Sequence, residues 1–148
     1  MASKLEKIFA DFLTNNNIKY VSQKTVNNCP FNRGGKYKID FYLPDYDLYI
    51  EVKGQMTMYQ VNVLRYCSEY LGKNYYILQM TSEDWIGPYS CSGLKNIRSK
   101  IMQDTATQFN EILDLSQNRI TTDELCKRSK IRLEKYIAYR NGDISRWI

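Results

Sequence analysis

The segment from residue 36 to residue 54 (KYKIDFYLPDYDLYIEVKG) constrains the fold more than any other part of the chain. Apolar side chains occupy every second position on both sides of a turn: Ile39, Phe41 and Leu43 before it, and Leu48, Ile50 and Val52 after it. Alternation with a period of two is typical of a strand with one buried face. Two such runs around a Pro/Asp turn predict a β-hairpin with one apolar and one polar face.

The pairing of this hairpin decides which acidic residues meet. With the turn centred between Asp45 and Tyr46, Asp40 lies opposite Glu51, and Lys53 extends from the same face. Opposed residues have Cβ atoms about 4.5 to 5.5 Å apart, so the two carboxylates are close enough to share a cation. Mg²⁺ prefers such oxygens and keeps several waters. The alternative is a surface hairpin in which Asp40 and Lys53 form only a cross-strand ion pair.

The segments around the hairpin predict an α/β fold. The expected elements are a helix over 3–14, a strand over 18–25, a helix over 58–71, a strand over 74–80 and one or two helices between 94 and 113. A strand, a crossover helix and a second strand predict a right-handed parallel connection. We therefore expect a mixed central sheet flanked by helices.

Composition excludes several kinds of chemistry. The chain has no histidine, which removes serine–histidine and cysteine–histidine catalysis and metal sites that use histidine. Its four cysteines (Cys29, Cys67, Cys91 and Cys126) are too far apart for a zinc ribbon. Chemistry in this chain therefore depends on carboxylates, lysine and a metal. No apolar run is long enough to span a bilayer, and acids interrupt the N-terminal helix, so we expect a cytoplasmic protein without a membrane anchor.

Positive charge is concentrated near the C-terminus. The whole chain has a net charge of +5, and residues 117–148 alone hold eight Lys and Arg against four Asp and Glu. A concentrated basic segment indicates a polyanionic partner, most often nucleic acid. A solvated surface helix is the alternative interpretation of the same pattern.

The acidic residues of the hairpin resemble the motif of the PD-(D/E)XK nuclease superfamily. This motif has an acid on one strand, Glu-x-Lys on the next and a Glu on the preceding helix; here these are Asp40, "EVK" at 51–53 and Glu6. The resemblance covers about residues 3–80 and extends to phage junction-resolving, restriction and homing endonucleases. It implies that Asp40 and Glu51 bind Mg²⁺, with Mn²⁺ able to substitute. It further implies that Val52 contributes its carbonyl and that Lys53 is the catalytic lysine.

Two positions depart from the motif or have a second explanation. The literal Pro-Asp pair is Pro44-Asp45, but this places Asp45 at the hairpin tip, too far from Lys53 to share a metal. Asp40 follows Ile39 rather than proline. Glu6 fits a role beside the metal, yet Ser3 and Glu6 also match a capping box at the helix start.

Basic and amide side chains surround the expected site. Arg33, Lys36 and Lys38 flank a Gly-Gly loop, and we expect them to contact DNA phosphates. Gln55, just beyond the motif, would contact phosphate or a metal-bound water, with an ordinary loop position as the alternative.

The segment 120–143 (ITTDELCKRSKIRLEKYIAYRNGD) resembles the helix-turn-helix of phage-repressor-type regulators. The resemblance implies a helix over 123–129, a turn at Ser129-Lys130-Ile131 and a second helix over 132–140. In such motifs the second helix enters the major groove. The expected DNA contacts are Arg132, Leu133, Glu134 and Lys135 at the bases, and Lys130 and Arg140 at the phosphates. A helical hairpin packed on the core is the alternative.

Together these features predict a nuclease core over 1–90, a helical connector over 91–116 and a helix-turn-helix segment over 117–148. The expected function is Mg²⁺-dependent endonuclease cleavage of double-stranded DNA, with a site-specific homing-type or phage-encoded enzyme as first choice. The alternatives are a structure-selective nuclease such as a Holliday junction resolvase, a restriction or mismatch-repair endonuclease, and a DNA-binding regulator on an inactive nuclease fold. One such site cuts one strand, so double-strand cleavage predicts a homodimer or a higher homo-oligomer.

Overall fold

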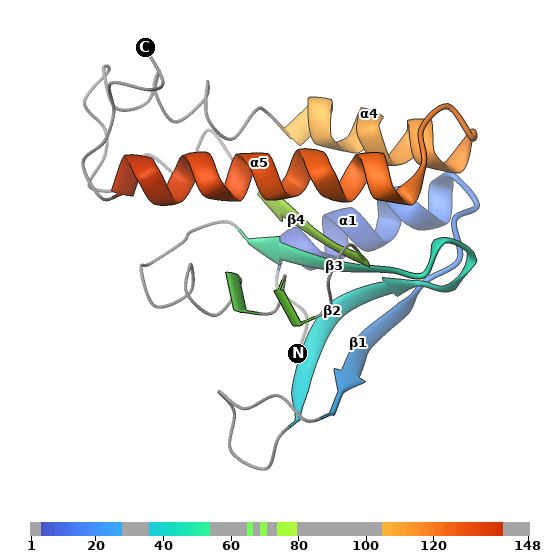
Figure 1. Ribbon diagram of the computed structural model, residues 1–148. Coiled ribbons are helices and arrows are strands. Elements are labelled where there is room, and N and C mark those ends of the chain that lie inside the picture. Colours follow the sequence, from blue (N-terminus) through green and yellow to red (C-terminus); the bar gives the residue numbers. More distant parts are fainter. Residues whose placement is uncertain are drawn as a thin grey trace.

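The computed structural model describes residues 4–27, 36–53, 65–66, 69–70, 74–79 and 105–140, and the side chains of all of these except 105–106 and 135–140 (Figure 1). The helices are α1 (Lys4–Asn15), α4 (Thr105–Ser116) and α5 (Thr122–Arg140). The strands are β1 (Val21–Val26), β2 (Tyr37–Leu43), β3 (Leu48–Lys53) and β4 (Tyr75–Gln79). None of the described helices is long and apolar enough to cross a membrane.

The four strands form one mixed sheet in the order β1-β2-β3-β4. The pairs β1–β2 and β2–β3 are antiparallel, whereas β3 and β4 are parallel. The expected α/β class and the parallel return of the chain after the hairpin are therefore confirmed. Of the expected helix over 58–71, only 65–66 and 69–70 are described, and both pairs are helical. The expected boundary between the nuclease core and the helical connector, at residues 90–91, lies outside the described residues.

The hairpin pairs in the predicted register. Phe41 lies opposite Ile50, and Leu43 opposite Leu48. The turn between the strands is a 3-10 helix over Pro44–Tyr46, with proline at its first position. Asp47, the residue that follows this helix, has a left-handed backbone conformation (φ 48°). The Tyr42 hydroxyl donates a 2.8 Å hydrogen bond to the Asp47 carboxylate, which helps to fix this conformation. The turn therefore sets the pairing on which the site depends.

One face of the sheet packs against α1, α4 and α5 (Figure 1). The shared buried cluster contains Phe9 and Leu13 from α1, Phe41, Leu43, Leu48, Ile50, Val52, Tyr76 and Leu78 from the sheet, and Ile112, Leu115, Leu125 and Cys126 from the last two helices. Burial of these apolar side chains is the main favourable contribution to the fold. Residues of the expected C-terminal segment thus belong to the same core as the hairpin.

The prediction of a turn at Ser129-Lys130-Ile131 is wrong, because α5 continues through these residues without a break. The buried positions of this helix are Leu125, Cys126, Ser129, Arg132 and Leu133. Their spacing of three and four residues gives one continuous helical face, and no Gly or Pro interrupts it. Because Arg132 and Leu133 are 6% and 4% exposed, they face the protein interior and not a DNA groove.

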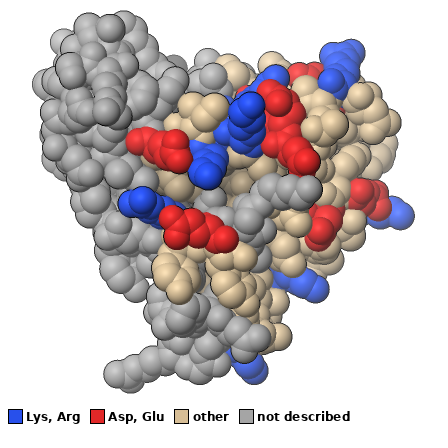
Figure 2. Space-filling model, viewed as in Figure 1, with Lys and Arg blue, Asp and Glu red and all other residues tan. Residues whose placement is uncertain are grey.

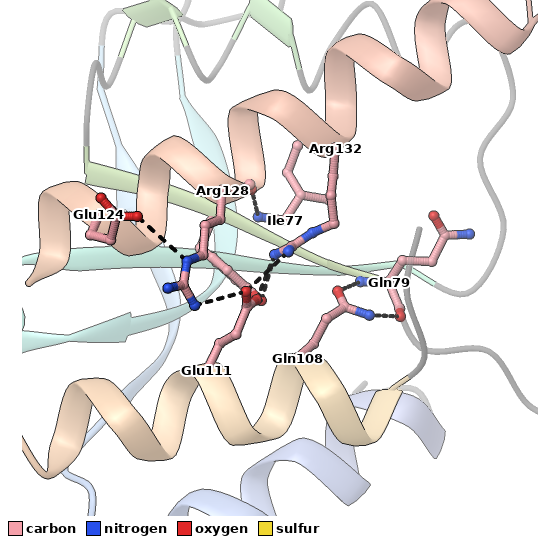
Figure 3. A network of polar contacts seen from close by, with 9 residues as sticks. Ile77, Gln79, Gln108, Glu111, Glu124, Arg128 and Arg132 are labelled. Carbon is pink, nitrogen blue, oxygen red and sulfur yellow. Dashed lines mark hydrogen bonds and ion pairs between the residues drawn. The ribbon is translucent and has the colours of Figure 1, made fainter. Parts of the chain in front are cut away.

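Arg132 is held in a buried network between α4, α5 and β4 (Figure 3). Its guanidinium donates to both carboxylate oxygens of Glu111, at 2.8 and 3.2 Å, and to the Tyr76 hydroxyl at 2.8 Å. The Tyr76 hydroxyl in turn donates to Glu111 at 2.8 Å. Arg128, which is partly exposed, adds a 3.4 Å contact to Glu111. The positive charge of Arg132 therefore neutralises a buried carboxylate.

Side chains from both C-terminal helices close the outer edge of β4 (Figure 3). The Ile77 amide donates to the Ser129 hydroxyl at 2.8 Å. The Gln108 side-chain amide accepts from the Gln79 N–H at 2.9 Å and donates to the Gln79 carbonyl at 2.6 Å. Gln108 thereby takes the place of a neighbouring strand. Such contacts are needed because buried backbone groups must be paired.

Replacing Gln108 by Met is expected to destabilise the protein by about 2 to 4 kcal/mol, because it leaves two buried backbone groups of Gln79 unpaired. Equilibrium unfolding in urea measures this loss. Asn110→Ala, on the exposed side of the same helix, should change the free energy of unfolding by less than about 0.5 kcal/mol. Equal effects of the two substitutions would show that Gln108 does not stabilise the edge.

Candidate active site

The site lies where the two strands of the hairpin stop pairing through their backbones. Beyond the Phe41–Ile50 pair, the Asp40 N–H donates to the Glu51 carboxylate at 2.9 Å. In return, the Val52 N–H donates to the Asp40 carboxylate at 2.9 Å. Each acid thus binds the backbone of the opposite strand, and the predicted encounter of Asp40 with Glu51 is confirmed. The two reciprocal hydrogen bonds fix both carboxylates on rigid strands.

Asp40 also marks a distortion on its other side. The β1–β2 register pairs Ser22 with Phe41 and Lys24 with Ile39, but not Gln23 with Asp40. Gln23 has a positive φ of 55°, which is unusual for a residue other than glycine. Backbone conformations of this kind are often retained at functional sites. Nothing in "VSQKTV" differs from an ordinary edge strand, so the positive φ of Gln23 could not be predicted from the sequence.

Glu51 is the most deeply buried acid of the site, at 1% exposure. Its second carboxylate oxygen accepts a 3.2 Å hydrogen bond from the Tyr37 hydroxyl and lies 3.6 Å from the Lys53 amine. Burial raises the pKa of Glu51, while Lys53, the Asp40 amide and Tyr37 oppose that rise. The Lys53 side chain is 23% exposed, so its amine is paired with Glu51 yet open to solvent.

Glu6 joins the site from the first turn of α1. Burial, the charge of Glu51 and a side-chain hydrogen bond with Glu6 together raise the pKa of Asp40 from 3.8 to about 7, and the hydrogen bond from the Val52 amide opposes this rise. Glu6 therefore contacts Asp40, as the role beside the metal requires. The capping box remains a second explanation because Ser3 lies outside the described residues.

The donor set suits a hard divalent cation. The Asp40 carboxyl contacts Glu6 and is close enough to Glu51 to feel its charge, and Glu51 lies beside Lys53; a cation held by Asp40 and Glu51 would offset the excess negative charge. Each carboxylate oxygen has two lone pairs, so the hydrogen bonds to backbone amides leave capacity for a metal. Within the described ranges, no three His, Cys, Asp or Glu side chains are arranged to hold a metal ion. A site here would therefore use two carboxylates and several waters, as Mg²⁺ commonly does.

The basic residues expected at the DNA have different positions in the structure. Lys36 and Lys38 are exposed at the start of β2, and Lys130 and Glu134 are exposed on α5. Lys135 and Arg140 belong to α5, but their side chains are not described, and Arg33 and Gln55 lie outside the described residues. Figure 2 shows acidic and basic side chains intermingled over the described part of one face. On that face the described residues form no uninterrupted basic surface.

Two residues near the site were not expected from the sequence. Tyr37 binds Glu51, although a tyrosine at a strand start usually indicates only strand propensity. Gln79 pairs with Lys53 across the parallel strands. Its position in "YYILQM" suggested only the end of a buried strand. Both contacts depend on which strands become neighbours, and no local pattern carries that information.

No protein-family model, curated protein or solved structure matches this chain. The resemblance to the PD-(D/E)XK superfamily therefore depends on Glu6, Asp40 and the Glu51–Lys53 segment themselves.

Proposed function

We propose that the protein is a metal-dependent nuclease that hydrolyses DNA phosphodiester bonds, with Asp40, Glu51 and Lys53 as its active site. One observation carries this proposal. The carboxylates of Asp40 and Glu51 each accept a 2.9 Å hydrogen bond from a backbone N–H of the opposite strand, and the Lys53 amine lies 3.6 Å from the Glu51 carboxylate. A surface ion pair would not account for an acid as buried as Glu51, because an ordinary exposed pair keeps both groups in water.

Each residue has a part in this chemistry. Asp40 and Glu51 would hold Mg²⁺ or Mn²⁺, and the Val52 carbonyl is a further candidate ligand. When bound, the metal would activate a water and offset charge on the phosphate. The amine of Lys53 is partly exposed and would donate hydrogen bonds to the phosphate or to the attacking water. Glu6, through its contact with Asp40, adds negative charge to the metal site.

The burial of residues on α5 bears on whether the enzyme would recognise a DNA sequence or a DNA structure. Site-specific cleavage by a homing-type or phage-encoded enzyme was expected because a second helix would contact the bases. Arg132 and Leu133 are buried, however, so two of the four residues expected at the bases cannot reach DNA. This observation favours a structure-selective nuclease, such as a junction resolvase, as the second candidate, because shape recognition requires mainly backbone contacts. Cutting both strands would require two copies of the chain in either case.

Lys53→Ala tests the proposal. Cleavage of DNA in Mg²⁺ should fall by on the order of a hundredfold to a thousandfold, because the substitution removes a charged donor from the transition state. DNA binding, measured by fluorescence anisotropy, should stay within about threefold, since one partly exposed lysine contributes little to affinity. Lys127→Ala, an exposed lysine on α5, is the matched control and should cleave normally.

The opposite outcome would support the regulator on an inactive nuclease fold. In that case neither protein would cleave DNA in Mg²⁺ or Mn²⁺, and Lys53→Ala would retain full DNA binding. Normal cleavage by Lys53→Ala would show that the lysine is not part of the active site.

A further inference from the structure

Gln79 lies beside Lys53 at the ends of two parallel strands. The register pairs Lys53 with Gln79, and Glu51 with Ile77. Side chains alternate between the faces of a sheet, and paired residues of neighbouring strands project to the same face. Gln79 and Lys53 therefore share the face that carries Glu51. Adjacent strands are about 4.8 Å apart, well within the reach of a lysine side chain.

The side-chain amide of Gln79 is buried but has no hydrogen bond to the described part of the chain. Gln79 is 0% exposed, and neither its Oε1 nor its Nε2 atom has a partner among the described residues. The Gln108 amide binds the backbone of Gln79 and not its side chain, and in Figure 3 the Gln79 side chain extends away from Gln108. An unpaired buried amide is costly, and an apolar side chain of the same size would serve the core better. The amide at this position therefore indicates a partner in another state of the protein.

Lys53 is the side chain that would need a new hydrogen-bond acceptor when a metal is bound. In this structure its amine pairs with the Glu51 carboxylate at 3.6 Å. Under the proposed function, a divalent cation binds the same carboxylate and repels the ammonium group of Lys53. The amine then needs an uncharged acceptor on the same face of the sheet. The amide oxygen of Gln79 is a neutral acceptor with two lone pairs, and it accepts no hydrogen bond from any described residue.

We propose that Gln79 is a positioning residue that accepts a hydrogen bond from Lys53 once a divalent cation occupies Glu51. This proposal rests on the proposed function, because it assumes a metal at that carboxylate. Gln79 does not contact the substrate. It keeps the Lys53 amine close to the phosphate when the Glu51 carboxylate binds the metal and no longer pairs with Lys53. The ligand that drives the change is a hard divalent cation, Mg²⁺ or Mn²⁺.

The test is Gln79→Met, which keeps the length of the side chain and removes its acceptor. The matched control is Leu78→Met, a buried volume-conserving change on the opposite face of the same strand. In calorimetric titrations with Mn²⁺, Gln79→Met should bind about tenfold more weakly than the wild type, because the displaced lysine has lost its acceptor. Leu78→Met should bind Mn²⁺ like the wild type.

Two further measurements exclude a merely structural role. The Tm of the metal-free Gln79→Met protein should not fall, since in that state the amide makes no hydrogen bond with the residues that the structure describes. In DNA cleavage with Mg²⁺, kcat should fall about tenfold to a hundredfold at saturating metal with KM unchanged. A lower Tm, or Mn²⁺ affinity equal to that of the wild type, would overturn the proposal.

The titration and the cleavage assay separate the two proposals. If the wild type binds Mn²⁺ but cleaves no DNA, the nuclease proposal fails, and the Mn²⁺ affinities still decide the role of Gln79. If the wild type cleaves DNA and Gln79→Met cleaves and binds Mn²⁺ equally well, only the role of Gln79 is refuted. If the wild type binds no Mn²⁺, both proposals are overturned.

Discussion

Asp40→Asn is expected to abolish DNA cleavage while making the metal-free protein more stable above about pH 7. Cleavage should fall by on the order of a thousandfold or more, because the substitution removes a metal ligand that acts in the transition state. The gain in stability follows from the surroundings of the carboxylate. Burial, the charge of Glu51 and the contact with Glu6 raise the pKa of Asp40 from 3.8 to about 7.

The direction of the pH dependence follows from this shift. Because the folded state holds the Asp40 proton more tightly than the unfolded state, the stability that this group contributes is fully present below its unfolded pKa of 3.8. It is lost as the pH rises through about 7. Asparagine is neutral at every pH, and its carbonyl oxygen can still accept from the Val52 N–H. The difference in Tm between Asp40→Asn and the wild type should therefore increase from about pH 4 to about pH 8.

Thermal unfolding in EDTA across this pH range measures the effect. Asp45→Asn is the control, because Asp45 belongs to the literal Pro-Asp pair but is exposed at the hairpin tip. It should alter neither the pH dependence nor cleavage. Loss of cleavage in Asp45→Asn with normal cleavage in Asp40→Asn would show that the wrong acid has been assigned. A pH-independent Tm difference for Asp40→Asn would contradict the buried, acid-rich environment.

Arg132→Met is expected to cause the largest loss of stability, about 3 to 5 kcal/mol. It removes three hydrogen bonds and leaves the buried Glu111 carboxylate with only the partly exposed Arg128 as a cationic partner among the described residues. For a protein of this size, the Tm should fall by roughly 6 to 20 °C. Urea unfolding at neutral pH measures the change in free energy.

A double variant distinguishes loss of the ion pair from loss of packing. Glu111→Leu combined with Arg132→Met removes both charges, so it should be clearly more stable than Arg132→Met alone. Lys130→Met, an exposed change two residues away, should change the free energy of unfolding by less than about 0.5 kcal/mol. An unchanged Tm in Arg132→Met, together with weaker sequence-specific DNA binding, would instead support the helix-turn-helix assignment.

The hairpin was predictable because all of its determinants are local. The alternation of Ile39, Phe41 and Leu43 and the proline at the turn fix both the faces and the pairing, and the pairing places Asp40 opposite Glu51. The acids of the site follow from this geometry together with the family resemblance. The parallel return of β4 follows from the length of the segment between the strands, which is sufficient for a crossover helix.

The C-terminal helix was wrongly divided because its partners are distant in sequence. Ser129 is a residue typical of turns, but here it binds the edge of β4 at Ile77 and stays helical. Arg132 resembles an exposed DNA contact until Glu111 on α4 and Tyr76 on β4 are placed beside it. Patterns along the chain cannot reveal such contacts. For the same reason, Tyr37 and Gln79 were not predicted near Glu51 and Lys53.

Cleavage by the unmodified protein is the most direct test of the proposed nuclease activity. The full chain would be incubated with linear duplexes and four-way junctions in Mg²⁺, in Mn²⁺ and in EDTA, and the cut ends would be sequenced. We expect cleavage with either metal, none in EDTA and none by Asp40→Asn; discrete cuts in junctions alone would identify the structure-selective alternative. Absence of cleavage with both metals, or equal cleavage in EDTA, would contradict the assignment of Asp40, Glu51 and Lys53 as a metal-dependent active site.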